Sequence, residues 1–233
     1  RNFAEMSSVG FKKNFMTLAV KETIYREDFQ KVLEQTENED VRLLREKAFA
    51  FFAENGLPTP RDEEWKYTNV ASLPISNFKF QISNSESAAT ELLKDFNYGR
   101  NGFTALHLAF ADVVLLTIPK ETVIEKPFEL NFKAEDGTAN FPHIIVVAEA
   151  GSRATIIESY ESDGKNFTNA GVQIFVRDSA NLTHYRVQKE SAEAFHVGTT
   201  EITLARGSFY NSTNINLGAR LSRHDISLEF TAE

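Results

Sequence analysis

The pattern of apolar and polar residues divides the chain into a helical first third and a strand-rich remainder. Apolar side chains recur at steps of three and four residues from about residue 22 to residue 33 and again over residues 40–54. This is the spacing of one helix face, so two helices joined by the polar loop at residues 34–40 are predicted. In the second helix the apolar stripe consists of Val41, Leu44, Ala48, Phe51 and Phe52. The residues expected to face water are Arg42, Arg45, Glu46 and Glu54.

From residue 105 the pattern changes to short runs rich in β-branched and aromatic residues that end at Gly, Asn, Asp or Ser. Such runs are typical of strands. Strands are predicted at 105–111, 113–118, 128–132, 143–148, 155–160, 171–177, 183–188, 201–204, 209–216 and 224–230. No helix of ordinary length is expected between them, so an alternating α/β sheet is disfavoured.

A repeat of 28 residues runs through this strand-rich part. Segments 148–155, 176–183 and 204–211 each contain a strand end, a tight turn and a new strand, with Gly151, Ser179 and Gly207 at the turn. This period suits one coil of a solenoid, in which inward residues such as Ile174 and Leu204 fill the interior. We therefore predict a mainly β protein with a helical N-terminal region and a right-handed parallel β-helix. The alternative is an antiparallel sandwich with evenly spaced hairpins.

The stretch from Gly56 to Leu73 contains the only tryptophan of the chain. Gly56 is expected to end the preceding helix, and Pro58 prevents its continuation. Thr59 can cap a new short helix that has Pro60 in its first position and Asp62 three residues after the cap. These devices predict a short, well-capped helix or turn that directs Trp65 inward.

The same stretch resembles the N-terminal signature of the SufD family of iron–sulfur cluster assembly proteins. The matching residues are Pro58, Arg61, Glu64, Trp65, Lys66, Tyr67 and Thr68, and residues 141–161 and 218–230 are also similar to this family. Trp65, Lys66 and Tyr67 could form a partner surface. Alternatively, Trp65 and Tyr67 could staple the helical region to the first coil of the β-helix, and packing alone suffices to explain the motif.

The resemblance implies a non-catalytic scaffold subunit of a SufBCD complex. It implies a SufB-like partner on the β-helix and a SufC ATPase bound through C-terminal helices, which this sequence lacks. An iron–sulfur cluster is then expected only in the full complex, and no cofactor is expected on this chain alone. The histidine implicated in cluster assembly belongs to a C-terminal part of the family's β-helix, so no cluster-site residue is assigned.

The predicted organisation has four parts. Residues 1–20 are a leader whose first residues could be vector-derived, 21–73 the helical region, 74–104 a connector, and 105–233 an incomplete β-helix. The connector contains a short alternating run at 78–82 that could form an edge strand and a helical turn at 91–96. Because the sequence stops just after an apolar strand, we expect a truncated solenoid whose open coil could support a homodimer.

Composition narrows the function classes. The net charge of −8 is spread evenly, and no basic stripe points to nucleic acid or an anionic membrane. There is no cysteine, which excludes disulfides and thiolate-held clusters and agrees with a cytoplasmic location. No apolar run reaches the roughly 18–20 residues of a membrane span.

Candidate catalytic groups are sparse. The histidines, none spaced as a helical metal pair, are His107, His143, His184, His196 and His224. The Gly-Ser pairs at Gly151 and Gly207 are better explained as coil corners than as nucleophile elbows. A stand-alone β-helix enzyme acting on carbohydrate remains the alternative; it would need paired acids, and the aspartates of the repeat region are Asp163, Asp178 and Asp225.

Overall fold

The computed structural model describes residues 25–70, 73, 79–80 and 89–231 of the chain. The predicted helical hairpin is present and consists of residues 25–35 and α2 (Glu39–Asn55). Asn38 caps α2 by accepting hydrogen bonds from the backbone N–H groups of Asp40 and Val41. The helix ends as predicted at Gly56, which has a φ of +66°. The predicted leader at residues 1–20 and much of the connector lie outside the described residues.

Most of the predicted apolar stripe of α2 is buried, namely Val41, Leu44, Ala48 and Phe52. The prediction that Arg45 faces water is wrong, because its side chain is 6% exposed. Its guanidinium donates hydrogen bonds to the backbone carbonyls of Ala109 and Ala111, at 3.3 and 3.0 Å. Arg45 therefore satisfies carbonyl groups at the end of a second helix, a role that periodicity along one helix cannot reveal.

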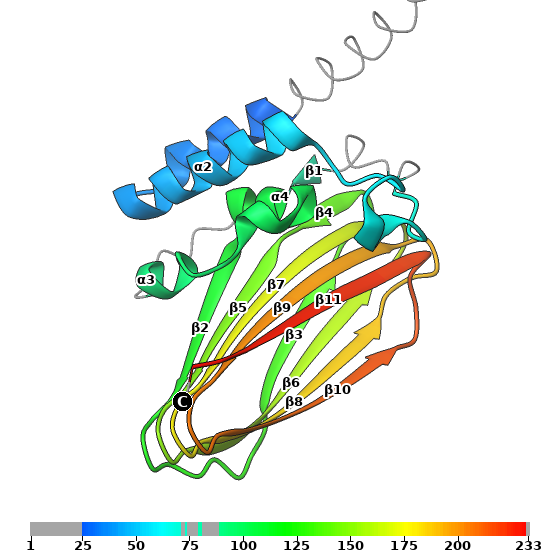
Figure 1. Cartoon of the computed structure of the whole chain (residues 1–233). Helices are drawn as coiled ribbons and strands as arrows, with labels where there is room; N and C mark the ends of the chain where they lie inside the picture. The colour runs from blue at the N-terminus through cyan, green and yellow to red at the C-terminus, as the bar shows by residue number, and fades with distance from the viewer. Residues whose placement is uncertain (1–24, 71–72, 74–78, 81–88, 232–233) are drawn as a thin grey trace, which may run out of the picture.

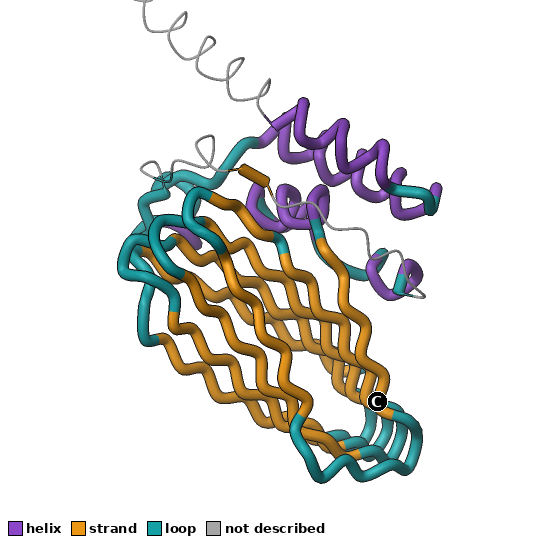
Figure 2. Tube along the Cα trace, turned by 180° about the vertical axis from the view of Figure 1, so that it is seen from behind, coloured by secondary structure: helices purple, strands orange, loops and turns teal. Residues whose placement is uncertain are grey.

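From residue 112 onward the described chain forms a parallel β-helix of about four coils, as predicted. All paired strands run parallel, which excludes the antiparallel sandwich. One sheet contains β1 (Lys79–Phe80), β2 (Asp112–Ile118), β4 (Thr138–Asn140), β5 (Pro142–Ala148), β7 (Phe167–Val176), β9 (Phe195–Leu204) and β11 (Leu221–Phe230). The other contains β3 (Phe128–Ala134), β6 (Arg153–Ser162), β8 (Asn181–Lys189) and β10 (Phe209–Asn216). Figures 1 and 2 show the two sheets facing each other, with the coil corners at their ends.

The 28-residue repeat equals the sequence distance between residues that pair in neighbouring coils. Ala148 pairs with Val176, and Val176 pairs with Leu204, in neighbouring strands. The predicted turn residues Gly151, Ser179 and Gly207 have φ values of +68°, +58° and +65°. This left-handed backbone conformation favours glycine. The same turn conformation therefore recurs at the same corner of each coil, every 28 residues.

The predicted strand at residues 105–111 is wrong, because these residues belong mainly to helix α4 (Gly102–Phe110). Asn101 and Thr104 form a capping box at its start. All nine residues of α4 are buried, so no polar face gives the helix a recognisable period. The connector also contains α3 (Thr90–Leu93) and the 3-10 helix η3 (Tyr98–Arg100). Of the predicted edge strand at 78–82, the described residues contain only β1, which consists of Lys79 and Phe80.

Two apolar cores result from this arrangement. One lies inside the β-helix and includes Ile144, Ile174 and Leu204, as predicted from the alternation. The other lies between the helices and the outer face of the larger sheet, where α4 packs on β7. Figure 1 shows α2 and α4 above this sheet and the smaller sheet on the far side. The central strands β5 and β7 are therefore buried on both faces, whereas β11 at the edge of the larger sheet is largely exposed.

Candidate functional site

The tryptophan motif lies where the helical region meets the β-helix. Trp65 is 2% exposed and closes the 3-10 helix η1 (Glu63–Trp65). One face of its ring stacks on Phe103 of α4, with 5.1 Å between ring centroids. Cζ of Arg223, on β11, lies 4.0 Å from the ring centroid. Trp65 therefore joins η1, α4 and β11 by packing. Tyr67, which was expected to pack together with Trp65 against the first coil, is 93% exposed, and the strand contact of Trp65 is made by the last described strand instead.

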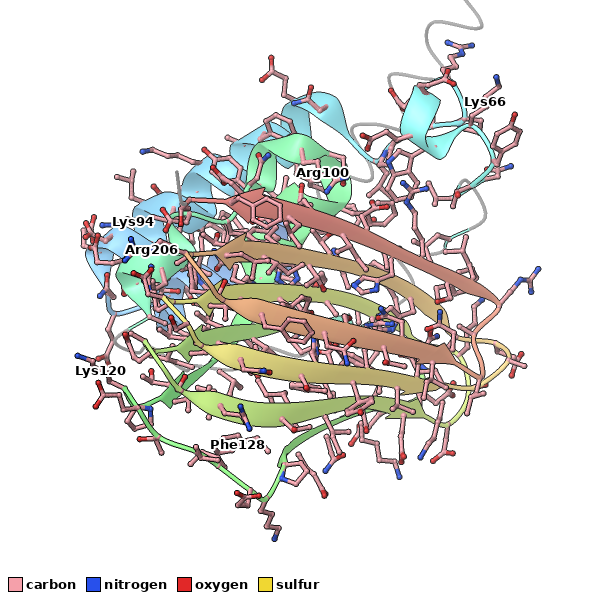
Figure 3. The ribbon with its side chains drawn as sticks, turned by 60° about the horizontal axis from the view of Figure 1, so that its bottom comes forward. Lys66, Lys94, Arg100, Lys120, Phe128 and Arg206 are labelled. Carbon is pink, nitrogen blue, oxygen red and sulfur yellow. The ribbon has the colours of Figure 1, made fainter. Side chains whose placement is uncertain are left out.

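The other motif residues surround this anchor at different depths. The Thr68 hydroxyl accepts a hydrogen bond from the Arg223 guanidinium at 3.4 Å, and Glu64 lies 3.8 Å from Arg100. Pro58 is half-buried, whereas Arg61, Lys66 and Tyr67 are exposed. Figure 3 shows Lys66 outside the stacked strands. The predicted cap is also altered: the Asp62 carboxylate accepts hydrogen bonds from the N–H and hydroxyl of Thr59, at 2.6 and 3.1 Å.

A second cluster of polar side chains lies inside the β-helix; we call it the lumen cluster. Its central members are Glu158, Arg186, Glu190 and His196, all less than 5% exposed. Glu158 and Arg186 pair in register on neighbouring strands, and Nε of Arg186 lies 3.2 Å from Oε1 of Glu158. This contact is an ion pair, and Oε1 of Glu158 accepts no hydrogen bond. Leu130 pairs with Glu158 in the first coil, so the cluster begins only at the second.

Hydrogen bonds connect the cluster across the two sheets. His196 donates from Nδ1 to the Glu190 carboxylate at 2.7 Å, and the Thr168 hydroxyl donates to the other Glu190 oxygen at 2.6 Å. The Arg186 guanidinium donates to Nε2 of His196. A carboxylate paired with histidine is an arrangement that can activate a base. Here Arg186 donates to the nitrogen that would accept a proton, so both ring nitrogens of His196 and both oxygens of Glu190 are engaged within the cluster.

The electrostatics agree with a neutral His196 beside an ionised Glu190. Burial lowers the pKa of His196, and the neighbouring Arg186 lowers it further, whereas Glu190 opposes both. Burial alone would raise the pKa of Glu190, but His196 and Thr168 outweigh it and hold that pKa below its ordinary value. Burial also lowers the pKa of His224 to about 3, and the Arg186 charge adds to this effect.

The predicted histidines fall into two separate groups. His184, His196 and His224 belong to the lumen side, but His184 and His196 lie in different sheets and so do not stack. His184 bonds the Tyr210 hydroxyl at 2.9 Å through Nδ1. His224 bonds the Thr200 hydroxyl at 2.8 Å through Nε2. Within the described residues no group of three or more His, Asp or Glu side chains is arranged to hold a metal ion.

His107 and His143 form the other group, between α4 and the outer face of the larger sheet. Nε2 of His107 lies 2.8 Å from Nδ1 of His143. The pair is bounded by the carbonyl of Asn169 and the side chain of Gln173, at 2.8 and 2.9 Å. Burial lowers the pKa of both histidines, that of His143 to about 4. They therefore serve as packed hydrogen-bonding groups.

The predicted acids are not brought together. Asp163 lies in the turn after β6, Asp178 at the corner after β7, and Asp225 on β11. Each lies near a basic side chain: Lys133, Arg206 and Arg223, respectively. Sequence reasoning missed Glu158, Arg186 and Glu190. The 28-residue spacing could have found the first two, because Glu158 and Arg186 occupy the same inward phase in successive coils.

The fold and the junction define a parallel β-helix protein with a helical N-terminal region fixed to its side. Two family models match this chain: the SufBD protein N-terminal region over residues 21–96, and the SufBD core domain of the SUF system for FeS cluster assembly over residues 131–233. Together the two matches cover well over half of the sequence. The chain therefore belongs to the SufBD family of iron–sulfur cluster assembly proteins.

Individual relatives agree with this assignment. An iron–sulfur cluster assembly SufBD family protein of Synechocystis is 25% identical over 91% of this chain and 63% of its own length. The iron–sulfur cluster assembly protein SufD of Escherichia coli is 32% identical over 76% of this chain and 53% of its own length. The chloroplastic protein ABCI7 of Arabidopsis thaliana is 24% identical over 60% of this chain and 32% of its own length. The chain thus spans 32% to 63% of the length of these relatives.

Proposed function

We propose that this chain is a non-catalytic, SufD-type scaffold subunit that takes part in iron–sulfur cluster assembly within a SufBCD-type complex. The observation that carries the proposal is the match of this chain to the SufBD family models and to SufD of Escherichia coli. The lumen cluster agrees with a non-catalytic role, because Arg186 donates to Nε2 of His196 and Glu190 accepts from its Nδ1. The separation of the three aspartates also disfavours the carbohydrate-cleaving alternative, which needs two facing acids. Family membership supports the cluster-assembly role.

Two observations support the proposed partners: the open edge of the last described coil and the membership of the chain in the SufBD family. Within residues 89–231, β10 and β11 each pair with one neighbour only. Ile226, Leu228 and Phe230 continue the inward columns of β9 and are 50%, 47% and 72% exposed. Such an edge can accept a further parallel coil. We propose a SufB-like subunit on the β-helix and a SufC ATPase on helices C-terminal to it.

The proposal includes two absences of activity. The chain alone is expected to bind no ATP and to hold no iron–sulfur cluster, because the cluster is cargo of the complete complex. Within the described residues no helix is long and apolar enough to cross a membrane. The cytoplasm is the proposed location, although the name of the Arabidopsis relative places that protein in the chloroplast.

Native mass spectrometry tests this proposal. The gene product that contains this chain is co-expressed with the SufB-like and SufC subunits of its source, and the purified assembly is weighed. A stoichiometric complex that contains all three subunits supports the scaffold role. Recovery of the chain without either partner, or release of reducing sugars from polysaccharides by the chain alone, would contradict it.

A further inference from the structure

In the part of the chain that the structure describes, no helix lies over the outside of the smaller sheet. The helices α2 and α4 lie on the side of the larger sheet (Figures 1 and 2). In the smaller sheet Ile156 and Leu182 point into the interior, so the residues that alternate with them point outward. We call the outward residues the outer face; they are every second residue over 153–161 on β6, 181–189 on β8 and 209–217 along β10.

The outer face exposes several large apolar side chains. Tyr185, Ile215, Phe209 and Leu217 are 37%, 39%, 57% and 69% exposed. Ile157 pairs in register with Tyr185 and is half-buried. Apolar side chains gathered on an uncovered sheet face are typical of an interaction surface.

The charges of the outer face are arranged symmetrically about one row of residues. This central row consists of Ile157, Tyr185 and Thr213, which lie level with one another in neighbouring strands. Arg153 lies four positions before the row on β6, and Glu161 lies four positions after it. Both are exposed. The outward residues of β6 therefore carry opposite charges at equal distances from an apolar centre.

The neighbouring strands follow the same symmetry. Along β10, Phe209 lies four positions before Thr213 and Leu217 lies four positions after it, so both distant positions are apolar. On β8 the corresponding positions are Asn181 and Lys189, which do not repel each other. A surface with this pattern is complementary to itself when a second copy is turned by 180° about the central row.

We propose that the outer face binds a second copy of this chain in a symmetric dimer. The twofold axis runs along the central row, so the two smaller sheets pack face to face with antiparallel strands. Arg153 then lies opposite Glu161 of the partner subunit, and Phe209 lies opposite Leu217 of the partner subunit. The long side chains of arginine and glutamate allow this pairing at the roughly 30° angle at which aligned sheets pack.

The contact is small, so the dimer is weak. At a strand spacing of about 4.8 Å and a rise of about 3.3 Å per residue, the outer face spans roughly 400 Å² on each copy. A contact of this size corresponds to a transient dimer with a Kd of roughly 10–300 µM. Glu129 on β3 lies level with the central row and would face Glu129 of the partner subunit, which keeps β3 out of the contact. The outer face is separate from the open β10–β11 edge, so the proposal goes beyond the scaffold role.

Reversal of the two charges tests the proposed symmetry. R153E and E161R each place like charges opposite one another and should raise the Kd about tenfold or more. An equimolar mixture of the two variants restores opposite charges at both places, and so does the double variant R153E/E161R. Both should dimerise nearly as well as the unsubstituted protein. The exposed contact of Glu161 with Lys189, at 3.6 Å within one copy, is worth little and does not alter this expectation.

Sedimentation velocity of the gene product that contains this chain measures the association from about 5 to 500 µM. A species of twice the smallest mass should grow with concentration for the unsubstituted protein, the mixture and the double variant, but not for either single variant. The control is K120E, which reverses an exposed charge in the turn after β2, away from the outer face (Figure 3). It should associate like the unsubstituted protein.

Three results would overturn the proposal. The first is the absence of any doubling in mass over this range. The second is doubling that persists in both single variants, which would place self-association at the open β10–β11 edge instead. The third is a mixture of R153E and E161R that associates no better than either variant alone.

Discussion

The guanidinium of Arg223 lies over the indole ring of Trp65, with 4.0 Å between Cζ and the ring centroid. Arg223 also donates to the Thr68 hydroxyl and pairs with Asp225 at 2.8 Å. The contact joins the last strand of the described β-helix to the motif near the end of the helical region. The end of the helical region and the last described strand are therefore fixed to each other through one buried aromatic ring.

We expect Arg223→Ala to lower the free energy of unfolding by about 1–2 kcal/mol, because it removes a desolvated cation–π contact and a hydrogen bond. Urea unfolding followed by Trp65 fluorescence measures the change. Arg220→Ala is the matched control, since this arginine is exposed in the preceding turn. Equal effects of the two substitutions would show that the Arg223–Trp65 contact contributes nothing specific.

A glycine is needed at position 171 because the side chains of His107 and His143 occupy the space where a Cβ would lie. A Cβ at this position would sit 2.2 Å from Nε2 of His107 and 2.7 Å from Nδ1 of His143. Gly171→Ala should therefore destabilise the chain by about 2–3 kcal/mol, as overpacking of a buried site does. Gly99→Ala is the control, because its added Cβ would meet nothing closer than 3.7 Å. Thermal unfolding of both variants compares them, and a Gly171→Ala variant as stable as the control would disprove the packing described for the pair.

Removal of the central cation of the lumen cluster should be severe. Arg186→Met leaves Glu158 buried without its ion pair, which typically costs about 3–5 kcal/mol. The double variant Arg186→Met/Glu158→Leu removes both charges and should recover a large part of this loss. Urea unfolding of the two variants beside the unsubstituted chain makes the comparison. If the double variant is less stable than Arg186→Met, the two charges are not a pair.

Stability should fall on acidification before the carboxylates in general titrate. Burial lowers the pKa of His143 to about 4 and that of His224 to about 3, from an ordinary value of 6.5. The unfolded chain thus takes up these protons at a higher pH than the folded chain does. Their contribution is complete above about pH 6.5 and declines as the pH falls toward these folded values. The loss by about pH 4.5 is up to roughly 2–3 kcal/mol for each histidine.

His224→Asn tests this dependence, because it removes one titrating group from the lumen side. The urea midpoint is followed between about pH 7.5 and 4.5, and the decline should be shallower for the variant than for the unsubstituted chain. Superimposable pH profiles would mean that His224 is not buried in its neutral form. Glu190 changes stability in the same direction, since its lowered pKa makes the folded chain resist protonation.

The solenoid could be predicted because its coils repeat both a spacing and a corner conformation. Gly151, Ser179 and Gly207 mark the same turn in successive coils, so the spacing of these small residues predicts the register of the coils. Helix α4 could not be predicted in the same way. It is buried between α2 and the larger sheet, and a helix without a polar face carries no period that distinguishes it from a strand.

The candidate site was predicted in part, for a related reason. Trp65 was expected to point inward and does, but its partner Arg223 is 158 positions away and carries no local signal. Glu158 and Arg186 have polar side chains at inward positions, where alternation predicts apolar ones. Only the coil register shows that these two residues compensate each other.

The central claim, that this chain contributes contacts and not chemistry, is tested most directly by anaerobic cluster reconstitution. Iron and sulfide bound per assembly are measured for the gene product alone, for the SufB-like and SufC subunits together, and for all three. We predict no stable cluster on the gene product alone and the highest cluster content when all three are present. A stoichiometric cluster on the gene product alone, or equal loading of its partners without it, would contradict this account.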